Sequence, residues 1–240
     1  MSGKVTILEW TTKNPLQQIG YNAGVCWGAN VDDKEKNIKR AKECIKSGHG
    51  RVMEFPDVYV VIDEYSAKCI RELFTHIGGS PTRLQASTRY IDYSKGFKTI
   101  VPPSVKNNEK AIEVWEKAID TISKSMISLK ELGIPNEDLT NLLPLAYSTK
   151  MVWKVNLRTL INFFGQRKCY RAYYEIRELC DELIKVLSNY SDEWSLICKE
   201  LFVPKCEQYK FINKNFCFCT EKKGCGRHPN IKDLKIIKNN

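Results

Sequence analysis

The stretch "NLRTLINFFGQRKCYRAYYEIREL", residues 156–179, carries the strongest structural signal in the chain. Its apolar residues recur at spacings of three and four, which predicts a helix with one buried face: Leu157, Leu160, Ile161 and Phe164. We therefore expect a helix over residues 148–165, ended by Gly165, and a second amphipathic helix over residues 171–190.

A polar pair lies on the same predicted helix as this apolar face. Arg158 and Asn162 are four residues apart, so they share one side of the helix. Their position beside so many apolar residues favours the wall of a ligand site, and a solvated polar face is the alternative. Arg167 follows Gly165 and is expected just beyond the end of the helix.

A second polar segment, "THIGGSPTRLQASTRY", covers residues 75–90. Glycines and a proline at positions 78–81 predict a turn whose backbone N–H groups can approach an anion closely. Arg83 and Arg89 carry forked donors that suit a phosphate or a carbonyl-rich ring. The residues alone leave open whether the segment only turns the chain or binds a phosphorylated ligand.

An extended segment is expected at residues 86–93, "ASTRYIDY". Along an extended chain Gln85, Ser87 and Arg89 alternate, so all three would point to one face. Three polar side chains on one face, between apolar elements, favour a ligand-binding surface. A sheet surface that faces solvent is the alternative.

A third segment, "SGHGRVMEF" at residues 47–55, places His49 between two glycines. Gly48 and Gly50 let the backbone turn sharply. His49 could then hydrogen-bond a ligand at the end of a helix, and a loop histidine without a ligand is the alternative.

The remaining pattern predicts a helix-rich α+β fold. Strands are expected at residues 4–8 and 57–63, where Val and Ile are frequent. Further helices are expected at residues 30–50, 66–79 and 107–135, and the residues that should cap or stop helices are Asp32 or Asp33, Gly48, Ser66, Gly78, Gly133 and Asn136.

The chain of 240 residues has a formal net charge of +10, from 38 Lys and Arg against 28 Asp and Glu. A basic chain attracts polyanions such as nucleotides, polyphosphate cofactors or nucleic acid, and plain solubility is the alternative. The start, "MSGKVTILEW", lacks the apolar region of a signal peptide. No run reaches the ~18 apolar residues of a membrane helix. We therefore expect a cytoplasmic protein without a membrane partner.

The ten cysteines fall into two groups. Six are scattered, and without an export signal we expect them to be reduced and mostly buried. The others lie in a Cys-rich extension at residues 204–240, which follows a main domain at residues 1–203. With His228 they could bind a structural zinc ion: Cys206, Cys217, Cys219 and Cys225. Reduced thiols are one alternative, and a disulfide or a redox role is the other.

Together the three polar segments resemble the flavin-dependent thymidylate synthases, the ThyX family. The order agrees over residues 5–203: a Gly-His segment ending in Glu, a strand, a helix, a motif closing on Ser-x-Arg-Tyr, a long helix, "IPNEDLTNLLP" and the block at residues 156–179. The resemblance implies FAD-dependent reductive methylation of dUMP to dTMP, with methylenetetrahydrofolate and NADPH as co-substrates. It also implies one domain with a central, mostly antiparallel sheet, and a homotetramer with active sites between subunits. Neither a nucleic-acid partner nor a cysteine nucleophile is implied.

The resemblance also implies roles for individual residues. The implied flavin contacts are His49, Arg51, His76, Asn156, Arg158 and Asn162. The implied dUMP contacts are Glu72, Thr75, Arg83, Gln85, Ser87, Arg89 and Arg167. Among these, Ser87, Arg89 and Arg167 are expected to be catalytic, because arginines can polarise the uracil carbonyl.

The chain departs from the family motif at several of these positions. Thr75 and Ile77 flank His76 where the family has arginines, and the segment up to "STRY" is about two residues longer than usual. Gln85 stands where the motif has a glutamate. Thr140 stands about where the family has an arginine that binds the dUMP phosphate.

These departures leave the substrate open. Arg83, Arg71 and Lys150 are candidate replacements for the missing cations, and we expect Arg83 to take over the role. One alternative function is a flavin enzyme that modifies a related pyrimidine nucleotide at C5. Another is a non-catalytic relative that binds nucleotides or nucleic acid.

Overall fold

The computed structural model describes residues 3–78, 81–212 and 217–234 of the chain. The chain forms two compact units, each built from segments that are far apart in the sequence. The first unit consists of Met1–Lys4, Val61–Thr75 and Arg83–Val152, and the second of Val5–Val60, His76–Thr82 and Trp153–Asn240. The expected division into residues 1–203 and 204–240 stays a prediction.

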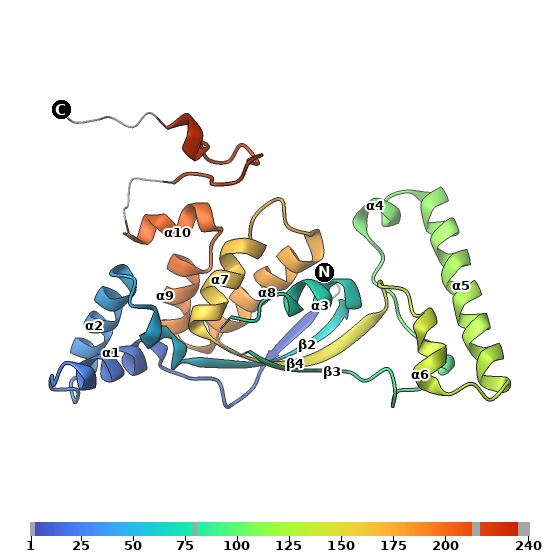
Figure 1. The fold of residues 1–240 in the computed structure, drawn as a ribbon, viewed down its shortest axis with the longest axis horizontal. Coiled ribbons are helices and arrows are strands. Elements are labelled where there is room, and N and C mark those ends of the chain that lie inside the picture. Colours follow the sequence, from blue (N-terminus) through green and yellow to red (C-terminus); the bar gives the residue numbers. More distant parts are fainter. Residues whose placement is uncertain (1–2, 79–80, 213–216, 235–240) are drawn as a thin grey trace. The chain divides into compact units, whose positions relative to one another are not determined.

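Four strands form one antiparallel sheet in the order β1-β2-β4-β3 (Figure 1). They are β1 (Lys4–Ile7), β2 (Asp57–Ser66), β3 (Thr82–Gln85) and β4 (Ser148–Asn156). Val58, Val60 and Ile62 of β2 are fully buried, as alternate residues on one face of a strand should be. Together with the many helices, this sheet confirms the expected α+β class.

The expectation of a continuous helix over residues 148–165 is wrong in its first half. Residues 148–156 form β4, and the helix α7 (Leu157–Arg167) begins only after it. The buried residues of β4 recur at a period of two, which is typical of a strand, and pairing with β2 and β3 stabilises the strand. Gly165 does not end the helix but lies buried within it. The buried alternate positions of β4 are Thr149, Met151, Trp153 and Val155.

The second unit is mostly helical. It holds α1 (Pro15–Cys26), α2 (Lys34–Lys46), α7, α8 (Tyr174–Tyr190), α9 (Asp192–Leu201) and α10 (Lys205–Ile212). Helix α1 packs along α2, and α7, α8 and α9 pack in succession (Figure 1). The core is aromatic, since the Phe164 and Phe202 rings stack with their centroids 4.0 Å apart and Trp153 meets Phe163 edge to face.

The first unit holds α3 (Ala67–Phe74), α4 (Pro103–Lys106), α5 (Glu109–Glu131) and α6 (Asn136–Leu139). Helix α5 is the long helix predicted over residues 107–135, and its first turn is capped by the Asn108 side chain. Gly133, with φ of +80°, follows its end as expected. In the described part of the chain, no helix has both the length and the hydrophobicity to cross a membrane.

Only part of the apolar stripe of α5 is covered. Met126 is fully buried in a small core of the first unit, with Tyr93, Leu139 and Tyr147 around it. Towards the start of the helix, the members of the stripe stay partly exposed: Ile112, Trp115 and Ile119. An apolar stripe that the described residues leave partly exposed is typical of a contact with another protein surface.

Local capping signals predict some helix ends and miss others. The Asp33 and Ser66 side chains accept backbone N–H bonds in the first turns of α2 and α3, as expected. However, α3 ends at Phe74, before Gly78, and the Thr75 hydroxyl donates to the carbonyl of Glu72 in the last turn. Asn136 is the first residue of α6 rather than its cap, and its side chain accepts from Lys130 Nζ at 2.7 Å.

Candidate active site

A short 3₁₀ helix after α2, η1 (Gly50–Glu54), brings the carboxylate of Glu54 to α7. Arg158 Nη1 lies 2.6 Å from Glu54 Oε1, and Arg51 Nη1 lies 3.0 Å from Glu54 Oε2. The hydrogen bond from Arg158, with the charge of Arg51 in support, lowers the pKa of Glu54. An ionised Glu54 therefore joins two of the arginines that were assigned to the flavin.

Gly50 leaves room for this arrangement. A side chain at position 50 would place its Cβ 2.9 Å from Arg158 Cζ, closer than unbonded carbon atoms approach. Sequence reasoning missed the role of Glu54. Its signal is present, because a carboxylate three residues after Arg51 can pair with it within one turn.

An open pocket of about 480 Å³ borders this ion cluster. Its lining includes Arg158 and Asn162, so the two residues share one side of α7 and one pocket, as their spacing predicts. The guanidinium and amide groups, beside a glycine backbone, offer donors to an anionic or carbonyl-rich ligand. The complete lining is Glu54, Gly78, Arg158, Thr159 and Asn162.

Two polar residues hold the wall of this pocket in place. The Asn156 side chain is buried and accepts a hydrogen bond of 2.9 Å from the Thr159 N–H, so it caps α7. The Thr159 hydroxyl donates to the carbonyl of Gly78. Asn156 was expected to contact the flavin, and in the structure it fixes the start of α7 without lining the pocket.

His49 immediately precedes η1, and its side chain is exposed. Its backbone N–H donates to the Cys44 carbonyl at 2.9 Å, while that of Gly48 donates to the Ile45 carbonyl at 3.1 Å. With Gly48 at φ of +74°, this is a Schellman motif that ends α2. The expected helix end at Gly48 is thus confirmed, and a flavin contact of His49 stays a prediction.

His76 and Arg167 form a pair that sequence reasoning did not predict. Arg167 Nε donates to His76 Nε2 at 2.9 Å, so this ring nitrogen carries no proton. The His76 ring is only 4% exposed and meets the Phe163 ring edge to face at 5.0 Å. Arg167 is the last residue of α7, not beyond its end. His76 therefore fixes the direction of the arginine that was assigned to the substrate uracil.

In the first unit, Arg83 of β3 has an unusual environment. Its guanidinium group lies over the Phe74 ring, 4.4 Å from the centroid. Its Nη1 atom is buried and has no hydrogen-bond partner among the described residues. An unmet buried donor costs about 1–3 kcal/mol, so this nitrogen is available to a ligand or a water molecule that can accept the bond.

The expectation that Gln85, Ser87 and Arg89 alternate along an extended segment is wrong. Strand β3 ends at Gln85, and the chain then turns. The Ser87 Oγ accepts the Arg89 N–H at 3.2 Å, and the Ser87 carbonyl accepts the Ile91 N–H at 3.2 Å. A serine side chain that bonds the backbone two residues on is typical of a turn, and this bond overrides the extended pattern.

The side chains of this segment therefore point to different partners. Gln85 Nε2 lies 3.3 Å from both Tyr147 Oη and Thr149 Oγ1, whereas the exposed Arg89 pairs with Glu137 of α6, at 3.2 Å. Thr140, the position of the missing phosphate arginine, is buried. Its hydroxyl bonds the backbone carbonyl of residue 136 at 2.8 Å, so it serves the fold.

The other candidate residues of the first unit are less suited to an anion. Lys150 Nζ lies 2.7 Å from Asp63 Oδ2, and this hydrogen bond raises the pKa of Lys150. Arg71 is exposed on α3. Glu72 and Thr75 meet at the end of α3, where the Thr75 hydroxyl donates to the Glu72 carbonyl at 2.8 Å. A contact of Glu72 or Thr75 with dUMP stays a prediction.

All ten cysteines carry free thiols, and four of the six scattered ones are buried, as expected. In the extension, ligand atoms of Cys206, Glu207 and His228 lie within 4.8 Å of one another. Burial, with Glu207, Cys219 and Cys169 nearby, raises the pKa of Cys206 to about 11. Cys217 is half-buried and Cys225 exposed, and their part in a zinc site stays a prediction.

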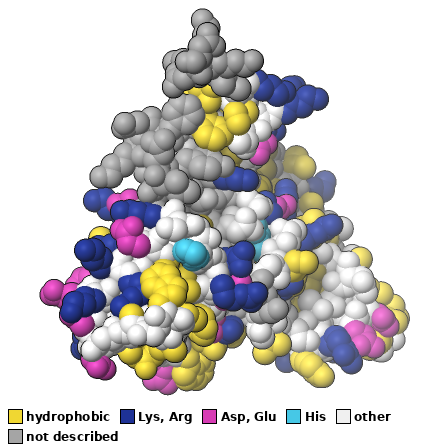
Figure 2. All heavy atoms as spheres, turned by 60° about the vertical axis from the view of Figure 1, so that its left-hand side comes forward, with side chains coloured by type: hydrophobic (Ala, Val, Ile, Leu, Met, Phe, Trp, Pro, Cys, Tyr) yellow, Lys and Arg dark blue, Asp and Glu magenta, His cyan; other side chains and the backbone are white. Residues whose placement is uncertain are grey.

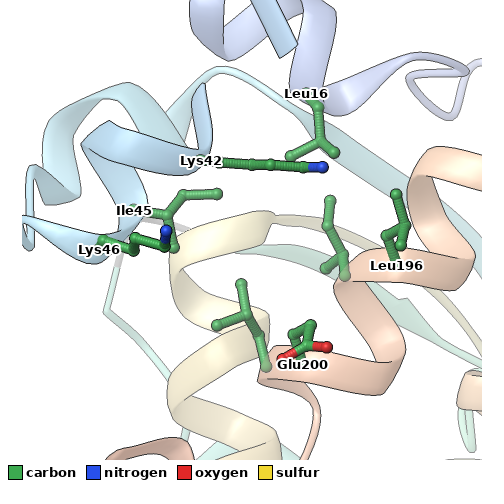
Figure 3. Close-up of a pocket in the computed structure, with 8 residues that line it drawn as sticks. Leu16, Lys42, Ile45, Lys46, Leu196 and Glu200 are labelled. Carbon is green, nitrogen blue, oxygen red and sulfur yellow. The ribbon is translucent and has the colours of Figure 1, made fainter. Parts of the chain in front are cut away.

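A separate apolar pocket of about 180 Å³ lies between α2 and α9 (Figure 3). Leu16, Ile45 and Leu196 are among its lining residues, with Lys42 and Glu200 beside them. It contains none of the candidate site residues. On the face drawn in Figure 2, Lys and Arg side chains are interspersed with Asp and Glu, so the described part of that face forms no purely basic surface.

The sequence matches one protein family over residues 6–190, described as thymidylate synthase complementing protein. A flavin-dependent thymidylate synthase of Pyrococcus furiosus is 31% identical over 222 residues, which cover 87% of this chain and 88% of the relative. One of Pyrococcus abyssi is 29% identical over 252 residues and covers 98% of each chain. This second match must therefore run into the Cys-rich extension.

Among solved structures, a UMP/dUMP methylase, PolB from Streptomyces cacaoi, bound with 5-Br dUMP, has a similar fold. The TM-score is 0.67, and the match covers 84% of this chain and 96% of that one. At 13% identity the likeness concerns the fold alone. It agrees with the α+β architecture.

Proposed function

Because the chain belongs to the thymidylate synthase complementing protein family, we propose that it converts dUMP to dTMP as a flavin-dependent thymidylate synthase. Methylenetetrahydrofolate supplies the one-carbon unit that is attached to C5 of the uracil. NADPH supplies the hydride that reduces this unit to a methyl group through FAD. The observation that carries the proposal is the pocket of Arg158 and Asn162, where two implied flavin residues meet on one face of α7.

The residues around this pocket suit the parts of FAD. Arg158 and Arg51 share the single carboxylate of Glu54, so this cluster keeps a net positive charge that suits a pyrophosphate. Asn162 can donate to and accept from a flavin ring edge. When bound, FAD supplies the hydride-transfer chemistry, and the chain's part is to hold and orient the ring. His49, His76 and Asn156 are proposed to support it.

For the phosphate of dUMP we assign Arg83. A phosphate oxygen that reached its buried Nη1 would complete the bond that no described protein atom makes. Such a charge-assisted bond is about twice as strong as a neutral one. Phe74 holds the plane of the guanidinium group, so little side-chain freedom is lost when the anion binds. Gln85 is proposed to contact dUMP from the same strand.

Three residues are proposed to act on the uracil ring. Arg167, held by His76, polarises a ring carbonyl and stabilises the negative charge on its oxygen that makes C5 a nucleophile towards the one-carbon unit. Ser87 and Arg89 contact the nucleotide from the turn after β3. The ion pair of Arg89 with Glu137 is exposed, and such pairs contribute ~0–1 kcal/mol. A substrate anion can therefore displace it.

The proposed assembly is a homotetramer. The partly exposed stripe of Ile112, Trp115 and Ile119 supports it, because a second copy of the chain could cover an apolar stripe of this length. The resemblance to the family implies that the active sites of this tetramer lie between subunits.

A second candidate function is the C5 modification of a related pyrimidine nucleotide. The observation that favours it is Thr140, whose hydroxyl is used by the backbone at the position of the family's phosphate arginine. A site that lacks the phosphate arginine binds dUMP more weakly, unless Arg83 replaces that arginine. If Arg83 does not replace it, the same site residues would bind another pyrimidine nucleotide.

Purified protein tests the flavin part of the proposal. We expect a yellow protein with about one FAD per chain and a flavin spectrum that NADPH bleaches without oxygen. An Arg158→Ala variant should retain less FAD, because it loses a cation at the pocket. Lys185→Ala, which breaks an exposed ion pair on α8, is the matched control and should retain its FAD. A colourless protein that takes up no added FAD contradicts the proposal.

A further inference from the structure

The Cys-rich extension brings metal-ligating side chains together from two separate segments. Cys206 lies in the first turn of α10, and His228 lies twenty-two positions further along the chain. The ligand atoms of Cys206, Glu207 and His228 lie within 4.8 Å of one another. A thiol and an imidazole that meet at this distance are the donor types that zinc prefers.

Backbone hydrogen bonds pair Cys219 with the segment that follows His228. The Cys219 N–H donates to the Pro229 carbonyl at 2.8 Å, and the Ile231 N–H donates to the Cys219 carbonyl at 2.9 Å. Gly224 passes close by, since a Cβ at that position would lie 3.5 Å from Cys219 Sγ. These backbone bonds therefore hold Cys219 and the segment that bears His228 together before any ion is bound.

The carboxylate of Glu207 orients the histidine. Glu207 Oε1 lies 3.2 Å from His228 Nε2 and 2.8 Å from Arg227 Nε. With Nε2–H bonded to the carboxylate, Nδ1 is the ring nitrogen that can take a metal. Histidines that bind zinc commonly donate their other N–H to a carboxylate in this way. Because Glu207 already pairs with Arg227, it suits this orienting role better than that of a ligand.

A fourth donor, Cys169, comes from the segment after α7. A cavity of about 460 Å³ is lined by Cys169, Cys206 and Cys219, and also by Arg167. Cys169 lies two residues after the last residue of α7, so this cavity lies between the end of α7 and the extension. Three thiols line this cavity, and the His228 imidazole lies near one of them, Cys206, so the four side chains give the donor set of a Cys₃His site.

We propose that the chain binds one structural zinc ion through Cys206, Cys219, His228 and Cys169. As the three Zn–S bonds form, each thiol gives its proton to solvent, and no oxidant or reductant is needed. The ion ties the extension to the segment after α7. Arg171 of that segment already donates to the Lys223 carbonyl at 2.7 Å. Zinc thus braces the helix end that bears Arg167.

Metal analysis of the purified protein tests this site. After dialysis without free metal, the wild type should contain about one zinc ion per chain. Cys206→Ser and Cys169→Ser should each lose most of it, whereas Cys26→Ser, which removes an exposed thiol of α1, should keep it. Glu207→Gln should weaken zinc binding about 10- to 100-fold, as expected when an orienting partner is removed.

Cobalt titration of chelator-treated wild type adds a readout that needs no variant. Tetrahedral cobalt with thiolate ligands gives a thiolate-to-metal charge-transfer band, and circular dichroism shows that each protein is folded. The proposal is overturned if the folded wild type binds neither zinc nor cobalt. It is overturned equally if Cys206→Ser keeps its zinc, or if thiol titration finds the extension cysteines joined as a disulfide.

Discussion

Arg83 and Arg89 lie on the same short segment, yet their surroundings differ in a way that decides their roles. Arg89 is exposed and already has a carboxylate partner in Glu137. Arg83 stacks on Phe74 and has a buried nitrogen without a partner among the described residues. A bound anion gains more from Arg83 than from Arg89, because the charge of Arg83 is less screened by water.

The dUMP affinity of an Arg83→Ala variant follows from this difference. Loss of a charge-assisted bond of about 1.5–3 kcal/mol weakens binding about 10- to 100-fold. Lys150→Ala is the control, because the Lys150 amine is paired with Asp63, and it should change the affinity little. Calorimetric titration with dUMP measures both. An Arg83→Ala variant that binds dUMP as tightly as the wild type would show that another group holds the phosphate.

Single residues were predictable where the chemistry is local. The pairing of Arg158 and Asn162 in one pocket follows from their spacing of four. The bond between Arg167 and His76 joins residues 91 positions apart, and no spacing rule connects them. Glu54 was missed because its second partner, Arg158, is 104 positions away. Contacts over such separations exist only once the sheet and α7 have assembled.

Among the elements, η1 and α7 are the clearest case of two segments held together by charge. We call the ion pair between Glu54 of η1 and Arg158 of α7 the clamp. Helix α7 itself was predicted, but β4 before it was read as helix, because Met151, Trp153 and their neighbours are apolar enough for either element. Pairing with β2 and β3 decides for the strand. The turn after β3 was likewise decided by one serine hydroxyl rather than by the alternating pattern.

The clamp predicts a pH dependence of stability. The pKa of Glu54 is lowered in the folded chain, so its contribution is present above the unfolded value of ~4.3. It is lost as the pH falls through the lower folded value. Glu54→Gln should therefore reduce the Tm at neutral pH, and the difference from wild type should shrink below pH ~4.

Thermal unfolding followed by circular dichroism at several pH values measures this difference. Glu182→Gln is the control, because its ion pair with Lys185 lies within the single helix α8 and joins no separate elements. A Tm difference that grows towards acid pH would have the wrong sign and would contradict the assignment of the clamp.

At the scale of the whole molecule, the chain leaves an apolar stripe on α5 that its own residues cover only in part. We expect a tetramer of about four times the chain mass in solution. Ile119→Glu should shift the protein to smaller species, because it places a charge within the stripe. Ile127→Glu, on the same helix but outside the stripe, should leave the mass unchanged. Light scattering during gel filtration gives the mass, and a monomeric wild type would contradict the tetramer.

The α+β class of the whole molecule was predictable from the sequence, but several of its helices were not. The helices that were not predicted are α1, α9 and α10. Their apolar faces are short, and their positions depend on distant partners. The start of α1 shows this, since the Leu16 N–H donates to Glu193 of α9 at 2.7 Å. Only the folded chain brings that carboxylate to the helix start, where negative charge is stabilising.

Tritium release from dUMP labelled at C5 measures the proposed methylation itself. The assay contains purified protein with FAD, methylenetetrahydrofolate and NADPH, since methylation at C5 must expel the hydrogen there. We expect release of tritium to water from labelled dUMP, dependent on the folate, and formation of dTMP. Absence of release from dUMP, by protein whose flavin NADPH reduces, would contradict it. Release from labelled UMP in its place would identify the second candidate function.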